Sequence, residues 1–153
     1  MTGNGNGERI SYKSRYKHGV DDKRRVQIPA KWRSNADSVY SIYVWRTDSQ
    51  QFPCLLVLPP RTAEKLENQL MEMPFGDPKA ESLRRLLGAN SDDVSVDRAG
   101  RICIPDTLAK QAGINGEAIL VGLFDRFQIW NPEFYAQVEA VDQAQESQAR
   151  SLI

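Results

Sequence analysis

The chain has 153 residues, enough for one ordinary domain or two very small ones, and its 41% hydrophobic content can form a buried core. It contains no apolar run of about 18 residues, the length needed to span a bilayer. Residues 1–8, MTGNGNGE, lack the basic and apolar regions of a signal peptide. We therefore expect a globular, cytoplasmic protein with no membrane partner.

The formal net charge of zero hides an uneven distribution of charge. Residues 1–33 carry nine Lys or Arg and three acidic residues, a net +6, so the remaining 120 residues sum to −6. A basic end of this kind indicates an anionic partner, although a solvated basic face would give the same pattern.

The first half of the chain is predicted to be mainly strand. Residues 1–8, rich in Gly and Asn, form an expected disordered tail. The basic segment up to Val20 favours an edge strand that leads into a turn. Residues 39–46 and 54–58 are rich in β-branched and aromatic residues, which predicts two strands. Because both faces of the first of these strands are apolar, each needs cover, which a neighbouring subunit can supply.

The rest of the chain combines helices with a second pair of strands. Apolar stripes predict helices over residues 61–73 and 78–87, and a shorter one over 105–112 that stops at Gly113. Strands are expected over 118–123 and 126–130. A last helix is expected over 133–148, followed by a frayed end.

One short pattern occurs twice and organises these elements. Residues 20–29 read VDDKRRVQIP and residues 96–105 read VDRAGRICIP, an offset of 76. In each copy a charged turn runs from an Asp to an Arg, two apolar residues alternate, and Pro29 or Pro105 occupies the first position of a short helix. Such a repeat predicts two similar structural units.

Basic side chains gather around the first copy of the turn. The candidates for DNA contact are Lys13, Arg15, Lys17, Lys23, Arg24 and Arg25. Their charges can neutralise phosphates, and Arg can also read guanine in the major groove, which admits a two-stranded ribbon. For Arg25 and its counterpart Arg101, a structural pairing with Asp21 or Asp97 is an equally reasonable role.

The sequence lacks the residues that a catalytic or metal site would need. His18 is the single histidine, so neither a Ser/His/Asp set nor a Cys/His metal site can be assembled. Cys54 and Cys103 lie in apolar strand patterns and are expected to be core residues rather than a disulfide. Asp92 and Asp93 are expected to be solvated. We therefore predict no enzyme activity, no catalytic residues, no metal, no cofactor and no small-molecule substrate.

Several spans taken together resemble the bacterial MraZ family of the AbrB/SpoVT-like superfamily. They are YKHGVDDKRRVQIPAKWR, CLLVLPP, SLRRLLGANSDDVSVDRAGRICIP and VGLFDRFQIW, within residues 16–135. The first motif commonly reads DxKGR in that family, whereas here Arg24 takes the Gly place and Gly100 keeps it in the second copy. The residues that carry the motif are Asp21, Pro29, Asp97, Gly100, Arg101 and Pro105.

The resemblance implies a mainly β, α+β fold in which two tandem swapped-hairpin units form one pseudo-symmetric barrel. The expected divisions are a tail (1–8), repeat 1 (9–60), a helical connector (61–91), repeat 2 (92–135) and a C-terminal helix with a frayed tail (136–153). It also implies a nucleoid-associated, ring-forming regulator of transcription that binds promoter DNA repeats, often upstream of its own division and cell wall operon. The alternative is an antitoxin-like or other protein-interaction module of the superfamily.

The charges flanking the two turns differ. Basic residues surround the first turn, whereas Asp92, Asp93 and Asp97 lie near the second beside Arg98 and Arg101. We expect the first loop to contact DNA and the second to serve mainly to complete the barrel.

Overall fold

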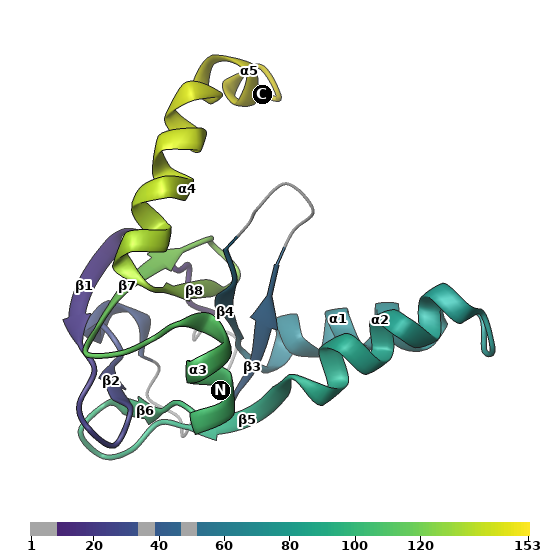
Figure 1. Cartoon of the computed structure of the whole chain (residues 1–153), viewed down its shortest axis with the longest axis horizontal. Coiled ribbons are helices and arrows are strands. Elements are labelled where there is room, and N and C mark those ends of the chain that lie inside the picture. The colour runs from purple at the N-terminus through teal and green to yellow at the C-terminus, as the bar shows by residue number, and fades with distance from the viewer. Residues whose placement is uncertain (1–8, 34–38, 47–51) are drawn as a thin grey trace.

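Figure 1 shows the computed structural model, which describes residues 9–33, 39–46 and 52–153. The predicted disordered tail, residues 1–8, lies outside these ranges. The strands are β1 (Arg15–Gly19), β2 (Arg25–Gln27), β3 (Val39–Trp45), β4 (Cys54–Leu58), β5 (Ser91–Ser95), β6 (Arg101–Cys103), β7 (Glu117–Gly122) and β8 (Phe127–Trp130). The helices are the 3-10 turn η2 (Ala30–Trp32), α1 (Pro60–Glu72), α2 (Pro78–Ala89), α3 (Asp106–Ala112), α4 (Pro132–Ala144) and α5 (Glu146–Arg150).

The strand order reveals an exchange between the two halves of the chain. Six strands form one antiparallel sheet in the order β1-β7-β8-β4-β3-β5, and β2 pairs with β6 in a separate two-stranded ribbon. The first strand of each half pairs with the third strand of the other half, because β1 lies on β7 and β5 lies on β3. The two repeats therefore cannot be separated without breaking the sheet.

The register confirms a two-fold relation between the halves. Val26 pairs with Ile102, its own equivalent at the offset of 76. Leu56 pairs with Gln128, its own equivalent at an offset of 72, the offset at which Leu58 and Pro60 match Trp130 and Pro132. An approximate two-fold axis thus passes through the middle of the ribbon and through the β4–β8 pair.

The predicted α+β class is confirmed, but no closed barrel of hydrogen-bonded strands forms among the described residues. The sheet is open, with β1 and β5 as its edges. Each edge strand instead continues through a turn into one strand of the ribbon, so the ribbon connects the two edges. The physical reason is that each turn lifts the chain off the sheet, so that β2 and β6 pair with each other. The assignment of the halves to AbrB-type units stays a prediction.

The main hydrophobic core lies between the sheet and the ribbon. The apolar residues of the repeated pattern, Val26, Ile28, Ile102 and Ile104, are completely buried there. Trp32 occupies the position equivalent to Leu108. Its ring packs against Phe127, with centroids 4.9 Å apart, and its Nε1 donates to the carbonyl of Lys13 at 2.9 Å. This contact fixes the segment before β1 to the short helix after β2.

A second, smaller core covers the other face of β3 and β4. All of β4 is buried, because Leu55 and Val57 face the main core while Leu56 and Leu58 face the second one. Tyr43 packs there with residues of α1 and α2, which extend away from the sheet in Figure 1. Both faces of β3 do need cover, and helices of the same chain cover the second face.

The helix predictions are accurate to within a few residues, except at the C-terminus. The helix predicted over 133–148 ends at Ala144, and Gln145 separates it from α5. The expected frayed end is thus partly a short helix, supported by an ion pair between Arg150 and Glu146 at 2.7 Å. Within the described ranges no helix is long and apolar enough to cross a membrane.

Candidate nucleic-acid interface

The β2–β6 ribbon has one buried and one outward face. Val26 and Ile102 point into the core, and because side chains alternate along a strand, their neighbours point the other way. The outward residues are Arg25, Gln27, Arg101 and Cys103, with Arg25 opposite Cys103 and Gln27 opposite Arg101. This face carries two guanidinium groups and no large apolar side chain.

The turn before each ribbon strand is built by the same hydrogen bonds. Asp21 Oδ1 accepts from the backbone N–H groups of Lys23 and Arg25, at 2.9 and 2.8 Å. Its Oδ2 accepts from Arg25 Nε at 2.7 Å. Each bond has its equivalent in the second turn, where Asp97 takes the place of Asp21. The proposed structural pairing of Asp with Arg is therefore present in both copies.

These bonds hold each carboxylate in its charged form. The backbone N–H of Arg25, joined by the Arg25 side chain and the N–H of Lys23, lowers the pKa of Asp21 below its ordinary value. The backbone N–H of Arg101 lowers the pKa of Asp97 in the same way, with Coulomb attraction to the Arg101 guanidinium as a further cause. Only Nε of each Arg is used; among the described residues Nη1 and Nη2 of Arg25 and Arg101 make no hydrogen bond. The pairing therefore leaves both guanidinium groups able to contact a phosphate or a base.

Arg24 occupies a left-handed backbone position. Its φ is +61°, and the equivalent Gly100 has φ +82°, so both turns require this conformation. The Arg24 side chain leaves the turn: Nε donates to the carbonyl of Ile104 at 2.9 Å, and Nη1 lies 3.9 Å from Asp106. Arg24 thus links the first turn to the start of α3, in the other half of the chain.

The structure separates Arg15 and Lys17 from the turn. Both lie on β1, where Arg15 forms an ion pair with Glu139 of α4 and stacks over Tyr135, with Cζ 5.9 Å from the ring centre. Lys17 lies 3.8 Å from Glu117. Lys13 is exposed just before β1. Of the six predicted DNA-binding residues, Lys23, Arg24 and Arg25 therefore belong to the turn beside the ribbon, while Lys13, Arg15 and Lys17 flank it.

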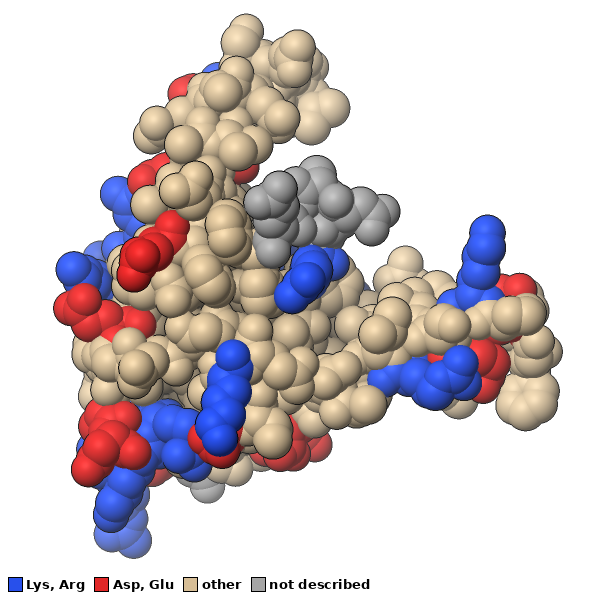
Figure 2. Space-filling model, viewed as in Figure 1, with Lys and Arg blue, Asp and Glu red and all other residues tan. Residues whose placement is uncertain are grey.

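The two edge strands differ in charge more than the two turns do. Residues 21–25 and residues 97–101 each sum to +1. On the edges, however, β1 carries Arg15 and Lys17, whereas β5 carries Asp92 and Asp93. Figure 2 shows Lys and Arg gathered with Asp and Glu at the lower left, where Figure 1 places the two turns.

Sequence reasoning missed two residues at the second turn. Gln27 donates from Nε2 to the carbonyl of Ala99 at 2.9 Å, and the Arg33 guanidinium lies over Gly100. One signal for Arg33 was present in the sequence. At the offset of 76 it corresponds to an uncharged residue, Ala109, so its charge is specific to the first repeat. Cys103, expected in the core, is exposed at the outward face, whereas Cys54 is buried.

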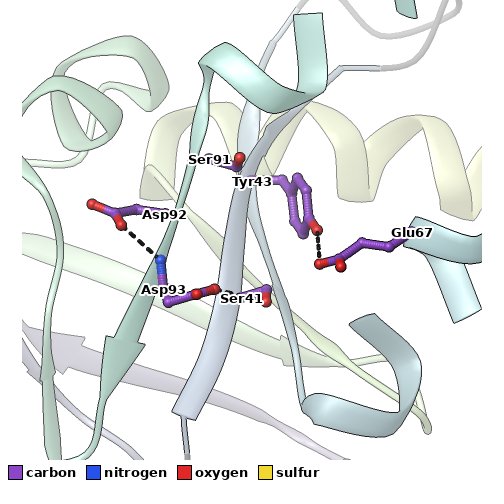
Figure 3. Close-up of a pocket in the computed structure, with 6 residues that line it drawn as sticks. All are labelled: Ser41, Tyr43, Glu67, Ser91, Asp92 and Asp93. Atoms are coloured by element: carbon purple, nitrogen blue, oxygen red, sulfur yellow. Dashed lines mark hydrogen bonds between the residues drawn. The ribbon is translucent and has the colours of Figure 1, made fainter. Parts of the chain in front are cut away.

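A small acidic recess lies away from the ribbon, where β3, β5 and α1 meet. Figure 3 shows its lining, Ser41, Tyr43, Glu67, Ser91, Asp92 and Asp93, around a volume of about 240 Å³. The Tyr43 hydroxyl donates to Glu67 at 3.4 Å, and Ser41 donates to Asp93 at 3.0 Å. Among the described residues no group of three or more His, Cys, Asp or Glu is arranged to hold a metal ion.

Comparison with known proteins places this architecture in a family. Residues 87–152 match the model of the MraZ protein family, whose description proposes a likeness to antitoxins. A transcriptional regulator MraZ from Roseiflexus castenholzii is 33% identical over 123 residues, which are 80% of this chain and 82% of the relative. The chain belongs to the MraZ family.

Other members show similar likeness. The transcriptional regulator MraZ of Leuconostoc mesenteroides is 32% identical over 125 residues, 82% of this chain and 84% of its own. That of Nitrosospira multiformis is 35% identical over 114 residues, 74% and 77% of the two chains. The family prediction is confirmed. These MraZ relatives are named as regulators of transcription and not as enzymes, in agreement with the prediction of no enzyme activity.

Proposed function

We propose that this MraZ protein is a cytoplasmic, nucleoid-associated transcription regulator that binds specific DNA through the outward face of the β2–β6 ribbon. In this proposal Lys23, Arg24 and Arg25 of the first turn form the main contact. Lys13, Arg15 and Lys17 extend the basic surface beside it. The expected target is the promoter of the protein's own division and cell wall operon.

The observation that carries this proposal is the rigid, outward presentation of Arg25 and Arg101. Both are anchored through Nε to an Asp, so little side-chain freedom is lost when the remaining N–H groups meet DNA. A two-stranded ribbon fits the major groove, where a guanidinium can contact O6 and N7 of guanine. Phosphate contacts by Lys23 would add affinity without adding sequence information.

We further propose that the protein acts as a ring-like homo-oligomer on repeated DNA elements. One small ribbon reads few bases, whereas several identical ribbons in one assembly gain affinity through effective concentration. Exposed apolar side chains support self-association: Met71 is 76%, Phe75 100% and Leu86 63% exposed, all on or between α1 and α2. Light scattering should give a multiple of 17.3 kDa at micromolar concentration; a monomer alone would contradict the assembly.

The test of the DNA-binding proposal is fluorescence anisotropy with labelled duplexes taken from upstream of the gene. A duplex with three regularly spaced elements should bind more tightly than one with a single element. If each loop touches three to four phosphates, the logarithm of the affinity should fall with the logarithm of salt at a slope of roughly −3 per engaged loop. Equal affinity for one and three elements would exclude the multivalent mode, and equal affinity for a scrambled duplex would exclude specificity.

The second candidate is an antitoxin-like module that binds another protein. The observation in its favour is the same exposed apolar surface between α1 and α2. A protein that stays monomeric and binds no upstream duplex would favour this candidate over the regulator.

A further inference from the structure

The second turn is covered by a side chain from the first half of the chain. Gly100 has a positive φ, and a β-carbon placed there would lie 2.7 Å from Arg33 Cζ and 2.9 Å from Gln27 Nε2. The Arg33 guanidinium therefore occupies the space that a side chain at position 100 would need. Glycine at this turn allows the positive φ. It also leaves room for the Arg33 guanidinium, which has no counterpart in the second repeat.

The opposite end of the ribbon is built differently. There Arg24 replaces the glycine, and its own side chain reaches the Ile104 carbonyl and Asp106. The positions equivalent to Asp106 and Arg33 are Ala30 and Ala109. The first turn thus faces an acidic residue from repeat 2, whereas the second turn faces a guanidinium from repeat 1.

We infer that Arg33 is a further DNA-contacting residue that turns the second hairpin into a second phosphate contact. The inference rests on the proposed function. With Arg33 added, the charge at the second turn rises from +1 to +2. Arg33 lies beside Gln27, an outward residue of the ribbon, so it is on the face proposed for DNA. Guanidinium suits this role because its planar set of donors matches phosphate oxygens.

The short length of the ribbon places both turns near one duplex. A strand of three residues spans about 7 Å between its ends. The Debye length at physiological salt is about 8 Å, so a phosphate over one turn is still influenced by the other. DNA lying on the ribbon would therefore meet cations at both ends, and the cation that Arg33 adds to the second end comes from repeat 1. In this inference the second loop does more than complete the barrel, its main role expected from the sequence, because Arg33 adds a positive charge to it.

The first test compares Arg33→Ala with Lys31→Ala, which removes the same charge from the exposed side of η2. Anisotropy is measured on the upstream duplex over a range of salt concentrations. Arg33→Ala should weaken binding at least about fivefold and reduce the magnitude of the salt slope by about 0.9, the loss of one phosphate contact. Lys31→Ala should change affinity less than about twofold. Equal effects of the two substitutions, or an unchanged salt slope for Arg33→Ala, would overturn the inference.

A double-mutant cycle with Gly100→Ala tests the position of the guanidinium. The added methyl displaces Arg33 from the turn, so in the Gly100→Ala background the further change Arg33→Ala should cost little affinity. Additive effects would contradict the inference. Thermal unfolding of each variant controls for loss of structure. If the wild-type protein itself fails to bind the duplex, the proposed function fails; if wild type binds and Arg33→Ala binds equally, only this inference fails.

Discussion

The two hairpin turns have the same backbone and different surroundings. In both, one Asp accepts two backbone N–H groups and the Nε of the Arg four residues later, and the residue before that Arg has a positive φ. The positions between them differ: Asp22, Lys23 and Arg24 correspond to Arg98, Ala99 and Gly100. The Asp and Arg of the motif therefore set the geometry of each turn, while the intervening residues and their neighbours set the charge presented to a partner.

The largest loss of DNA binding is expected when the first turn is made to resemble the second. The double change Lys23→Ala/Arg24→Gly installs the residues of positions 99 and 100. Two lost phosphate contacts should weaken binding of the upstream duplex at least about tenfold and reduce the salt slope by about 1.8. As a control, Lys79→Ala/Arg85→Ala removes the same charge from exposed positions of α2 and should leave binding nearly unchanged. Wild-type affinity in the first variant would mean that the turns do not differ in function.

Lowering the pH should remove the stabilisation that Asp21 and Asp97 give to the two turns. The pKa values of Asp21 and Asp97 are lowered in the folded state, so the stability they contribute is complete above the ordinary carboxyl pKa of about 4 and is lost as pH falls through the folded values. The melting temperature should therefore decline as the pH falls below about 4. The decline should be smaller in Asp21→Asn/Asp97→Asn, which carries no titrating carboxyl at these positions. Identical pH profiles for the two proteins would show that the turn carboxylates are not responsible.

Arg24 allows the backbone strain of the first turn to be measured. Arg24→Ala and Arg24→Gly both remove the bond to Ile104, but only glycine adopts the positive φ without strain. The glycine variant should be more stable than the alanine variant by about 1 kcal/mol. For a chain of this length that corresponds to about 2–4 °C in melting temperature. Equal melting temperatures would mean that the turn relaxes when Arg24 is shortened.

The smallest effect is expected at Arg98, the exposed tip of the second turn. Because Arg33 and Arg101 remain, Arg98→Ala should weaken DNA binding by no more than about threefold at physiological salt. A loss as large as that of the Lys23→Ala/Arg24→Gly variant would show that the second turn depends on its own tip and not on Arg33.

The sequence predicts the parts of this structure that depend on local pattern. The repeated Asp, Arg and Pro residues predicted both turns, and the alternation of Val26 and Ile28 predicted which ribbon residues are buried. Contacts between residues far apart in the sequence could not be predicted. Arg15 meets Glu139, 124 positions away, and Arg24 meets Ile104, 80 positions away. Arg33 lies over Gly100 only because the ribbon joins the two halves.

The direction in which Cys103 points was also not predicted correctly from the sequence. Cys103 was expected in the core because it lies in an apolar segment, although the alternation of Ile102 and Ile104 places it on the opposite face of the strand. Its exposure follows from the register, in which Ile102 takes the buried place opposite Val26. The α+β class and the family were therefore accessible from the sequence, whereas the cationic residues that meet at each turn required the structure.

Cys103 allows the central claim, that DNA lies on the outward face of the ribbon, to be tested without any substitution. Its thiol is exposed opposite Arg25, whereas burial raises the pKa of Cys54 to about 12 and keeps that thiol unreactive. The rate of Cys103 alkylation by a small maleimide is measured by mass spectrometry, with and without saturating upstream duplex. We predict that the duplex slows alkylation of Cys103 at least about tenfold, and that a scrambled duplex slows it much less. An unchanged rate while anisotropy reports full binding would place the DNA elsewhere on the molecule and contradict the account.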